Sequence, residues 1–298
     1  MFDFLRDAGI NIILALPLIG AYALFALGIV VIYRASRVLN LAHGAIATLP
    51  AYVAYSLAPR IGPLPAVIAA VISGGAFGVI VERFVVRRLR AVSQTAQTVG
   101  TVAVFGLTVA FMGKVWGTSL LPGVEVVPHR AFRVGHALIF SDDFALVAVA
   151  ALAAGGFFAL FRLTNLGLAM RLAADNRRAA ALMGIDPERT TSAAWLLGGL
   201  FAGLGGILLA GATGLHPYIL PLQMLPAFVA ALLGGLDSAA GAVGGALVVG
   251  LAVGIVPSLG TFGRQVGAPQ LVLTLLAFLI MRLRGGKLQA SDVRAGLA

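Results

Sequence analysis

The sequence has 298 residues, of which 60% are hydrophobic and only 11% are charged. A soluble globular domain is roughly half apolar and about a quarter charged. The composition therefore excludes an ordinary soluble protein and predicts an integral membrane protein, surrounded by membrane lipid. The formal net charge of +10 would suggest nucleic acid as the partner of a soluble protein. In a membrane protein we instead expect the basic residues at one membrane face and no nucleic-acid partner.

Apolar segments follow one another along the whole chain. A helix of about 20 apolar residues crosses a bilayer, and on this basis residues 1–298 form a single all-α domain, a polytopic transmembrane helical bundle of about nine spans, within a range of roughly eight to ten. The predicted spans are 11–33, 38–58, 63–81, 95–114, 143–161, 191–212, 222–236, 239–257 and 268–283. The span 222–236 is short, and three prolines within 214–226 leave a re-entrant segment open as an alternative.

Lysine and arginine are unevenly divided between the loops that connect these spans. When the loops alternate and the 162–190 loop is placed inside, most of the 21 basic residues fall on the inner side. Positive residues concentrate in cytoplasmic loops. The bias predicts an N-terminus outside and a cytoplasmic C-terminus.

The second predicted span begins with polar residues in an otherwise apolar sequence. The stretch LNLAHGA, residues 39–45, contains Asn40 and His43, and Thr48 follows shortly after. Polar groups at membrane depth are often functional, so these three residues could line a solute path or gate. They could equally form a cluster that caps the helix and joins it to its neighbours.

The fourth predicted span carries the threonines Thr98, Thr101 and Thr108. Thr101 and Thr108 are seven residues apart and therefore share one face of a helix. They could line the same path, although threonine hydroxyls in helices often bond back to their own backbone. Both interpretations stay open at this point.

A second stretch, LDSAAGA at residues 236–242, is similar to LNLAHGA and places Asp237 where the first has Asn40. A parallel duplication would leave such an echo, although alanine and glycine are common enough here for chance to explain it. Asp237 could cap the helix that follows or take part in gating. Residues 116–142, between two spans, alternate in part and could form a short hairpin outside.

The segment AADNRRAAALMGIDPERTTSAAW, residues 173–195, is unusually polar for this chain. Asp175 is a good N-cap, and the residues that follow it favour a helix. Gly184 suits the left-handed position after that helix, with Ile185 making the usual apolar contact. Asp186 can then cap the next helix. The pattern predicts a short helix, a sharp turn and a transmembrane helix, suited either to a groove in a partner protein or to an anionic lipid surface.

Three stretches resemble one known family. They are RVLNLAHGAIATLPAYVAY (37–55), NLGLAMRLAADNRRAAALMGIDPERTTSAAWLLGGLFAGLGGILLA (165–210) and HPYILPLQMLPAFVAALLGGLDSAAGAVGGALVVG (216–250). Together they resemble the permease subunits of branched-chain amino acid ABC importers, of the smaller, high-affinity type. The resemblance implies two cytoplasmic ATPase subunits, a second permease subunit in a heterodimer and a periplasmic solute-binding protein as partners.

The resemblance also implies that the loop within 162–190 couples the permease to the ATPase. Importers of this class carry Glu-Ala-Ala, three further residues and then glycine. This sequence keeps the spacing but has arginine in place of the glutamate, which puts in doubt any contact the acid would make. The coupling residues implied are Asp175, Arg178, Ala179, Ala180, Gly184, Ile185 and Asp186.

The residues themselves exclude ATP hydrolysis by a P-loop in this chain. Neither Lys114 nor Lys287 lies in the G-x-x-x-x-G-K-[ST] pattern that cradles phosphates. Cysteine is absent, and the four histidines are too scattered to suggest a metal site. We therefore expect no catalytic residues, no metal and no cofactor, with ATP bound by a partner subunit.

The predicted function is a permease subunit that translocates branched-chain or related amino acids. Three alternatives remain: a urea or short-chain amide permease of the same family, a stand-alone secondary transporter or channel, and an intramembrane enzyme. The last has little support, because no set of nucleophile and base lies within the predicted spans.

Overall fold

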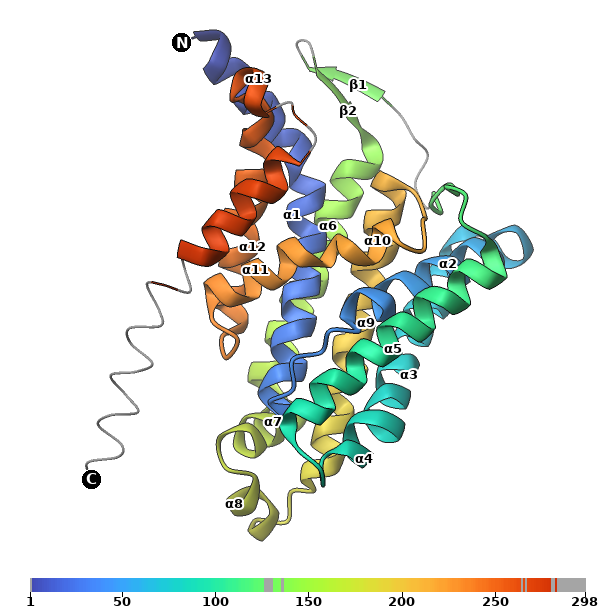
Figure 1. Ribbon diagram of the computed structural model, residues 1–298, viewed down its shortest axis with the longest axis vertical. Coiled ribbons are helices and arrows are strands. Elements are labelled where there is room, and N and C mark those ends of the chain that lie inside the picture. The colour runs from blue at the N-terminus through green and yellow to red at the C-terminus, as the bar shows by residue number, and fades with distance from the viewer. Residues whose placement is uncertain are drawn as a thin grey trace.

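The computed structural model describes residues 2–125, 131–134, 137–263, 265, 267–279 and 282. The predicted all-α fold is confirmed: these residues form a helical bundle with one small β-hairpin (Figure 1). The helices of the first half are α1 (Phe2–Ser36), α2 (His43–Ile61), α3 (Pro63–Val81), the π-helix Glu82–Val86, α4 (Arg87–Leu89), α5 (Gln94–Trp116) and α6 (Ser141–Leu163). Those of the second half are α7 (Asn165–Asp175), α8 (Arg177–Leu182), α9 (Pro187–Thr213), α10 (Ile219–Leu222), α11 (Met224–Gly234), α12 (Ala239–Ile255), the 3-10 helix Val256–Ser258, α13 (Gly260–Gly263) and a last helix, Ala268–Leu279.

The described residues contain six helices that are long and apolar enough to cross a membrane. The candidates are Ala15–Ser36, Pro63–Leu89, Gln94–Trp116, Leu146–Leu163, Pro187–Thr213 and Ala239–Ser258. The predicted count of about nine spans is not confirmed. The other three predicted spans correspond to α2, which carries His43, Thr48 and Arg60, and to two shorter apolar helices, Ile219–Gly234 and Ala268–Leu279.

Helices α1 and α9 form the enclosed centre of the bundle. Their apolar windows are 78% and 67% buried, against 17–39% for the other four candidate spans. Leucine, isoleucine, valine and phenylalanine side chains on α3, α5 and α6 are exposed instead. In lipid an outward apolar surface is the expected arrangement, because the bilayer replaces water as the solvent.

Glycines allow α3 and α9 to pack with their backbones in close approach. A Cβ atom on Gly74 would lie 2.7 Å from the Gly199 carbonyl oxygen, and one on Gly78 would meet the Trp195 carbonyl. Such distances leave no room for any side chain. Small residues allow the same close approach of helices in other membrane bundles.

The predicted hairpin between two spans is also confirmed. Strands β1 (Ala131–Val134) and β2 (Ala137–Phe140) pair antiparallel, and Val134 lies opposite Ala137 next to the turn. The hairpin leads directly into α6 and lies at the end of the bundle opposite α8 (Figure 1). The bundle therefore has two distinct ends, one with the hairpin and one with the short helices α7 and α8.

Candidate functional site

The short helix α8 begins at Asn176 rather than at the predicted cap, Asp175. The Asn176 Oδ1 accepts hydrogen bonds from the backbone N–H of Arg178 at 3.1 Å and of Ala179 at 2.9 Å. Asp175 is instead the last residue of α7. Asparagine has an extended backbone here and caps as well as aspartate does, so the cap is displaced by one residue.

The end of α8 has the predicted helix–glycine geometry. Gly184 has a φ of 81°, in the left-handed region. Its N–H donates to the Ala181 carbonyl at 3.0 Å, and the Ile185 N–H donates to the Ala180 carbonyl at 3.0 Å. These two bonds make a Schellman motif, which satisfies carbonyls that a helix end would otherwise leave unpaired. The prediction for Gly184 and Ile185 is confirmed.

Asp186 caps α9 as predicted. Its Oδ1 accepts from the N–H of Glu188 at 2.8 Å and of Arg189 at 3.2 Å, and Pro187 occupies the first turn of the helix. These two N–H groups, that of Glu188 first, hold the pKa of the Asp186 carboxyl below its usual value of 3.8. We call residues 175–186 the turn segment. Its backbone is fixed by a cap at each helix start and a Schellman motif between them.

The turn segment presents apolar side chains to solvent. Leu182 and Met183 are 87% and 60% exposed, and Arg178 beside them is also exposed. Ala180 is fully buried and Ala179 partly so, and these residues hold α8 against the bundle. Helix α8 projects from the end of the molecule (Figure 1), so Leu182 and Met183 are placed where another protein can reach them.

Asn40, His43 and Thr48 lie together in the interior, where α2 begins. All three are buried, and His43 lies beside the ring of Phe25 on α1. The Asn40 Oδ1 accepts from the Ala42 N–H at 3.1 Å, and the Thr48 hydroxyl donates to the Gly44 carbonyl at 2.8 Å. Helix α2 has no side-chain cap, so Asn40 does not cap it.

Thr98, Thr101 and Thr108 all lie on α5, as predicted. The Thr101 hydroxyl donates to the Thr98 carbonyl at 2.7 Å and accepts from the Leu41 N–H at 3.0 Å. It therefore joins α5 to the segment before α2, next to Asn40. The Thr108 hydroxyl donates to the Val104 carbonyl at 2.7 Å. Both buried threonines bond back to their own helix.

Asp237 does not cap α12 as one prediction held, because Ser238 occupies that position and accepts from the Gly241 N–H at 3.0 Å. Asp237 instead pairs with Arg37, at 2.8 Å between Nη1 and Oδ1. This ion pair connects the stretch 236–242 to Arg37, just before the similar stretch 39–45. Both side chains are at least half exposed, so the pair lies at the surface.

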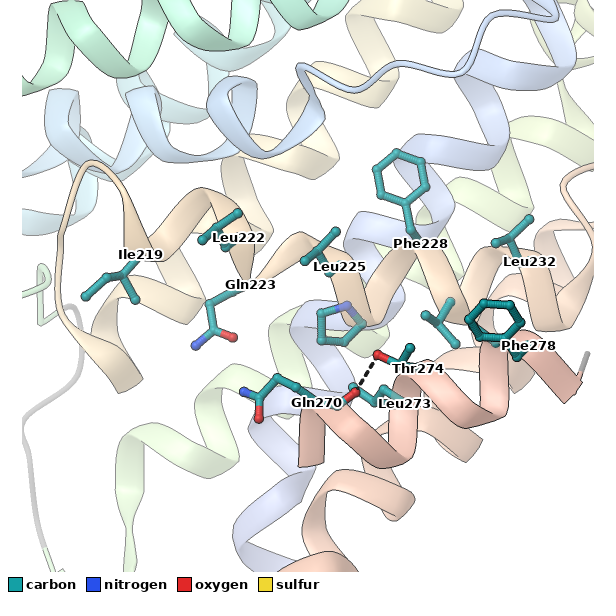
Figure 2. A pocket seen from close by; sticks show the side chains of 13 residues that line it. Ile219, Leu222, Gln223, Leu225, Phe228, Leu232, Gln270, Leu273, Thr274 and Phe278 are labelled. Carbon is teal, nitrogen blue, oxygen red and sulfur yellow. Dashed lines mark hydrogen bonds between the residues drawn. The ribbon is translucent and has the colours of Figure 1, made fainter. Parts of the chain in front are cut away.

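A groove of about 560 Å³ lies between α10–α11 and the helix Ala268–Leu279. Its lining is mostly apolar and includes Leu222 and Phe228, together with three uncharged polar residues, Gln223, Gln270 and Thr274. The Thr274 hydroxyl donates to the Gln270 carbonyl at 2.8 Å. Figure 2 shows the side chains of Gln223 and Gln270 reaching toward the same space from opposite walls.

The sequence analysis missed this groove, although two glutamines inside predicted apolar segments were a signal. None of the predicted path residues lines it. Among the residues that the structure describes, no group of three histidine, cysteine, aspartate or glutamate residues is arranged to hold a metal ion.

Comparison with known proteins gives consistent results. The family model described as "Branched-chain amino acid transport system / permease component" matches residues 11–282. The high-affinity branched-chain amino acid transport system permease protein LivH of Escherichia coli K12 is 26% identical over 78% of this chain and 80% of its own length. The corresponding BraD protein of Pseudomonas aeruginosa is 27% identical over 78% and 80%. A probable LivH of Methanocaldococcus jannaschii is 25% identical over 85% and 82%.

Among solved structures, PsaBC from Streptococcus pneumoniae in complex with Fab shares the fold. The TM-score is 0.51 at 15% identity, over 93% of this chain and 91% of the other. This likeness shows the fold alone. Because the family model covers nearly the whole sequence, the chain belongs to the family of permease components of branched-chain amino acid transport systems, and it is a transport component rather than an enzyme.

Proposed function

We propose that this chain is the transmembrane subunit of an ATP-binding-cassette importer that translocates branched-chain or related amino acids. In this assembly a periplasmic binding protein delivers the amino acid, and two cytoplasmic ATPase subunits and a second permease subunit complete the transporter. The names of the relatives support the substrate class. The N-terminus is then outside and the C-terminus in the cytoplasm, as the distribution of arginines favours.

The observation that carries this proposal is the geometry of the turn segment. A short helix with exposed Leu182 and Met183 projects from one end of the bundle. Two caps and the Schellman motif fix its direction relative to α9. A rigid helix end with a small apolar surface suits a groove in a partner protein. We therefore assign the turn segment, from Asp175 through Arg178 and Gly184 to Asp186, to the contact with an ATPase subunit.

The groove beside α11 suits the proposed solute. A branched-chain amino acid combines an aliphatic side chain with a zwitterionic group of no net charge. The groove offers the apolar Leu222 and Phe228 together with the amides of Gln223 and Gln270, and none of the described residues that line it is charged. Polar groups at membrane depth seldom face acyl chains and usually face a water-filled path or another helix. We propose that the groove forms this chain's side of the solute path.

Purification of a tagged chain from its native membrane tests the ATPase contact. Leu182→Asp places a charge on the exposed end of α8, and Leu120→Asp is the matched control, since Leu120 is 66% exposed in a different part of the molecule, outside the turn segment. We expect an ATPase and a second permease to co-purify with wild type and with Leu120→Asp, and the ATPase to be lost from Leu182→Asp. A wild-type chain that purifies alone would overturn the importer assignment. An ATPase retained by Leu182→Asp would overturn the contact.

A further inference from the structure

Glu82 is a buried charge next to the turn segment. Its side chain is 0% exposed, and it lies where α3 passes into the π-helix Glu82–Val86. Moving a carboxylate out of water is costly unless other groups pair with it and satisfy its oxygens. A fully buried glutamate at the end of a membrane helix therefore requires specific partners.

Both carboxylate oxygens of Glu82 are occupied. Arg87 donates from Nε to Oε1 at 3.1 Å and from Nη2 to Oε2 at 3.0 Å, which is a bidentate pair. The Ser192 hydroxyl of α9 donates to Oε2 at 2.9 Å. Arg90 approaches Oε1 at 3.8 Å. The buried carboxylate thus joins the end of α3 to α9 by accepting the hydrogen bond from Ser192.

The same arginines extend the contact to the first turn of α9. Arg87 Nη1 lies 3.0 Å from Glu188 Oε2, and Arg90 Nη1 lies 3.7 Å from Glu188 Oε1. Glu188 is two residues beyond Asp186, the last residue of the turn segment. We call Glu82, Arg87, Arg90, Glu188 and Ser192 the glutamate cluster. It includes residues of the first turns of α9, next to the point where the turn segment enters that helix.

The π-helix accounts for the bidentate pair. Glu82 and Arg87 are five residues apart, whereas side chains meet on an α-helix at separations of three or four. In a π-helix the backbone bonds join residues five apart, and the Arg87 N–H indeed donates to the Glu82 carbonyl. The π-turn therefore brings both side chains to one face, toward Ser192.

The rest of the contact between α3 and α9 is closely packed. Above the cluster, Gly74 and Gly78 pack against the backbone of α9 with no space for a side chain. Packed interiors change between discrete arrangements rather than deforming continuously. Glycine packing along the helices and the glutamate cluster at their end therefore hold α3 and α9 together at several points along their length.

We propose that Glu82 is a positioning residue that locks α3 to α9, so that the two helices move as one body when the turn segment is displaced. The proposal rests on the proposed function, in which an ATPase displaces the turn segment. The displacement then reaches α3 through the hydrogen bond between Glu82 and Ser192. Without the lock, α9 moves alone and the ATPase cycle is poorly converted into transport.

The test uses the complete wild-type complex in proteoliposomes, with uptake of radiolabelled leucine and ATP hydrolysis measured on the same sample. Glu82→Gln keeps the shape of the side chain but removes its charge. We expect uptake per ATP hydrolysed to fall about fivefold or more, the scale of a typical coupling between sites, while hydrolysis itself and subunit composition stay as in wild type. Glu125→Gln is the matched control, since Glu125 is exposed and lies outside the glutamate cluster, and we expect it to leave uptake per ATP unchanged.

A cysteine pair separates the lock from general stability. The chain has no cysteine, so Glu82→Cys combined with Ser192→Cys gives a single pair to join with a short bifunctional thiol reagent. We expect the open pair to be uncoupled and the joined pair to regain uptake per ATP. Uptake that the cross-link abolishes would show that α3 and α9 separate during transport and would overturn the proposal. Unchanged uptake per ATP in Glu82→Gln would overturn it as well.

The same experiments distinguish a failure of the proposal for Glu82 from a failure of the proposed function. If the wild-type complex shows no ATP-driven uptake of leucine, isoleucine or valine, the proposed function itself is wrong before any variant is compared. If wild type transports and Glu82→Gln does not assemble, the joined cysteine pair decides, because its covalent link replaces the hydrogen bond between Glu82 and Ser192. An assembled, cross-linked complex without coupled uptake counts against the lock.

Discussion

The region proposed to contact the ATPase and the groove proposed to hold the solute differ in whether their polar side chains have fixed partners. In the turn segment and the glutamate cluster, most described polar side chains have a fixed partner, such as Asn176 with the α8 N–H groups and Glu82 with Arg87. In the groove, Gln223 and Gln270 project toward an open space. The first arrangement suits transmission of force, and the second suits a solute that binds briefly and leaves. The predictions below ask whether the two regions can be altered independently.

The largest effect is expected at Gly184. Its φ of 81° is disfavoured for residues with a Cβ by about 1–2 kcal/mol, and a β-branched residue is worse. We expect Gly184→Val to reorient α8 and to reduce ATP-driven uptake by about tenfold or more. A loss of this size lies within the usual range of coupling between two sites. Gly184→Asn is the control, because asparagine tolerates this conformation and no atom lies near a new Cβ. Equal loss in both variants would mean that the conformation is not what matters.

A smaller effect is expected in the groove. Gln270→Leu removes an amide from the lining without changing the turn segment, and the loss of one hydrogen bond of about 1 kcal/mol corresponds to roughly fivefold weaker transport. We expect leucine uptake at low concentration to fall while the number of amino acids moved per ATP is kept. Leu271→Ala, on the same helix but outside the groove lining, should leave uptake close to wild type. If it does not, the effect belongs to the helix rather than to the groove.

A local effect is expected at Asp186. Because its folded pKa is lowered by the N–H groups of Glu188 and Arg189, the cap contributes stability above the unfolded value of 3.8 and loses it as the pH falls through the folded pKa. We expect Asp186→Ala to speed amide exchange at Glu188 and Arg189 at neutral pH. Asp186→Asn still accepts these hydrogen bonds and does not titrate. It should therefore protect both amides from exchange, and this protection should not be lost at acid pH. Hydrogen exchange read by mass spectrometry gives both results.

The smallest effect is expected at the Arg37–Asp237 ion pair. The two side chains are 50% and 62% exposed, and exposed pairs contribute about 0–1 kcal/mol. We expect Asp237→Asn to change thermal unfolding of the purified complex by little and to leave uptake per ATP unchanged. A large loss of transport with normal stability would instead return Asp237 to the gating role that the sequence suggested.

Local chemistry made the turn segment predictable. Gly184, Ile185 and Asp186 take the predicted positions because caps and Schellman motifs involve residues only a few positions apart. The cap of α8 lies one residue later than predicted. Both Asp175 and Asn176 can cap a helix, but Asp175 is the last residue of α7, so Asn176 takes the capping position. The identity of the elements was readable in the same way, from apolar length.

Long-range contacts were not predictable. Asp237 was expected to cap α12, but its partner Arg37 lies 200 residues away in the sequence. Glu82 has arginines five and eight residues later, which suggested only a basic loop, since the π-turn that pairs them is invisible in the sequence. The groove is formed by α10, α11 and the helix Ala268–Leu279, and only the packing of these helices makes it. Whether Asn40, His43, Thr48 and the α5 threonines contact solute stays a prediction.

The connection between α8 and α9 has one more consequence. Only Met183, Gly184, Ile185 and Asp186 separate the two helices, and three of these four use their backbone N–H in the Schellman motif or the last turn of α8. A link with so little slack transmits torque as well as displacement. A partner that rotates α8 about its own axis would therefore turn α9 together with α3, so that a small rotation at the protein surface changes how this pair of helices faces the rest of the bundle.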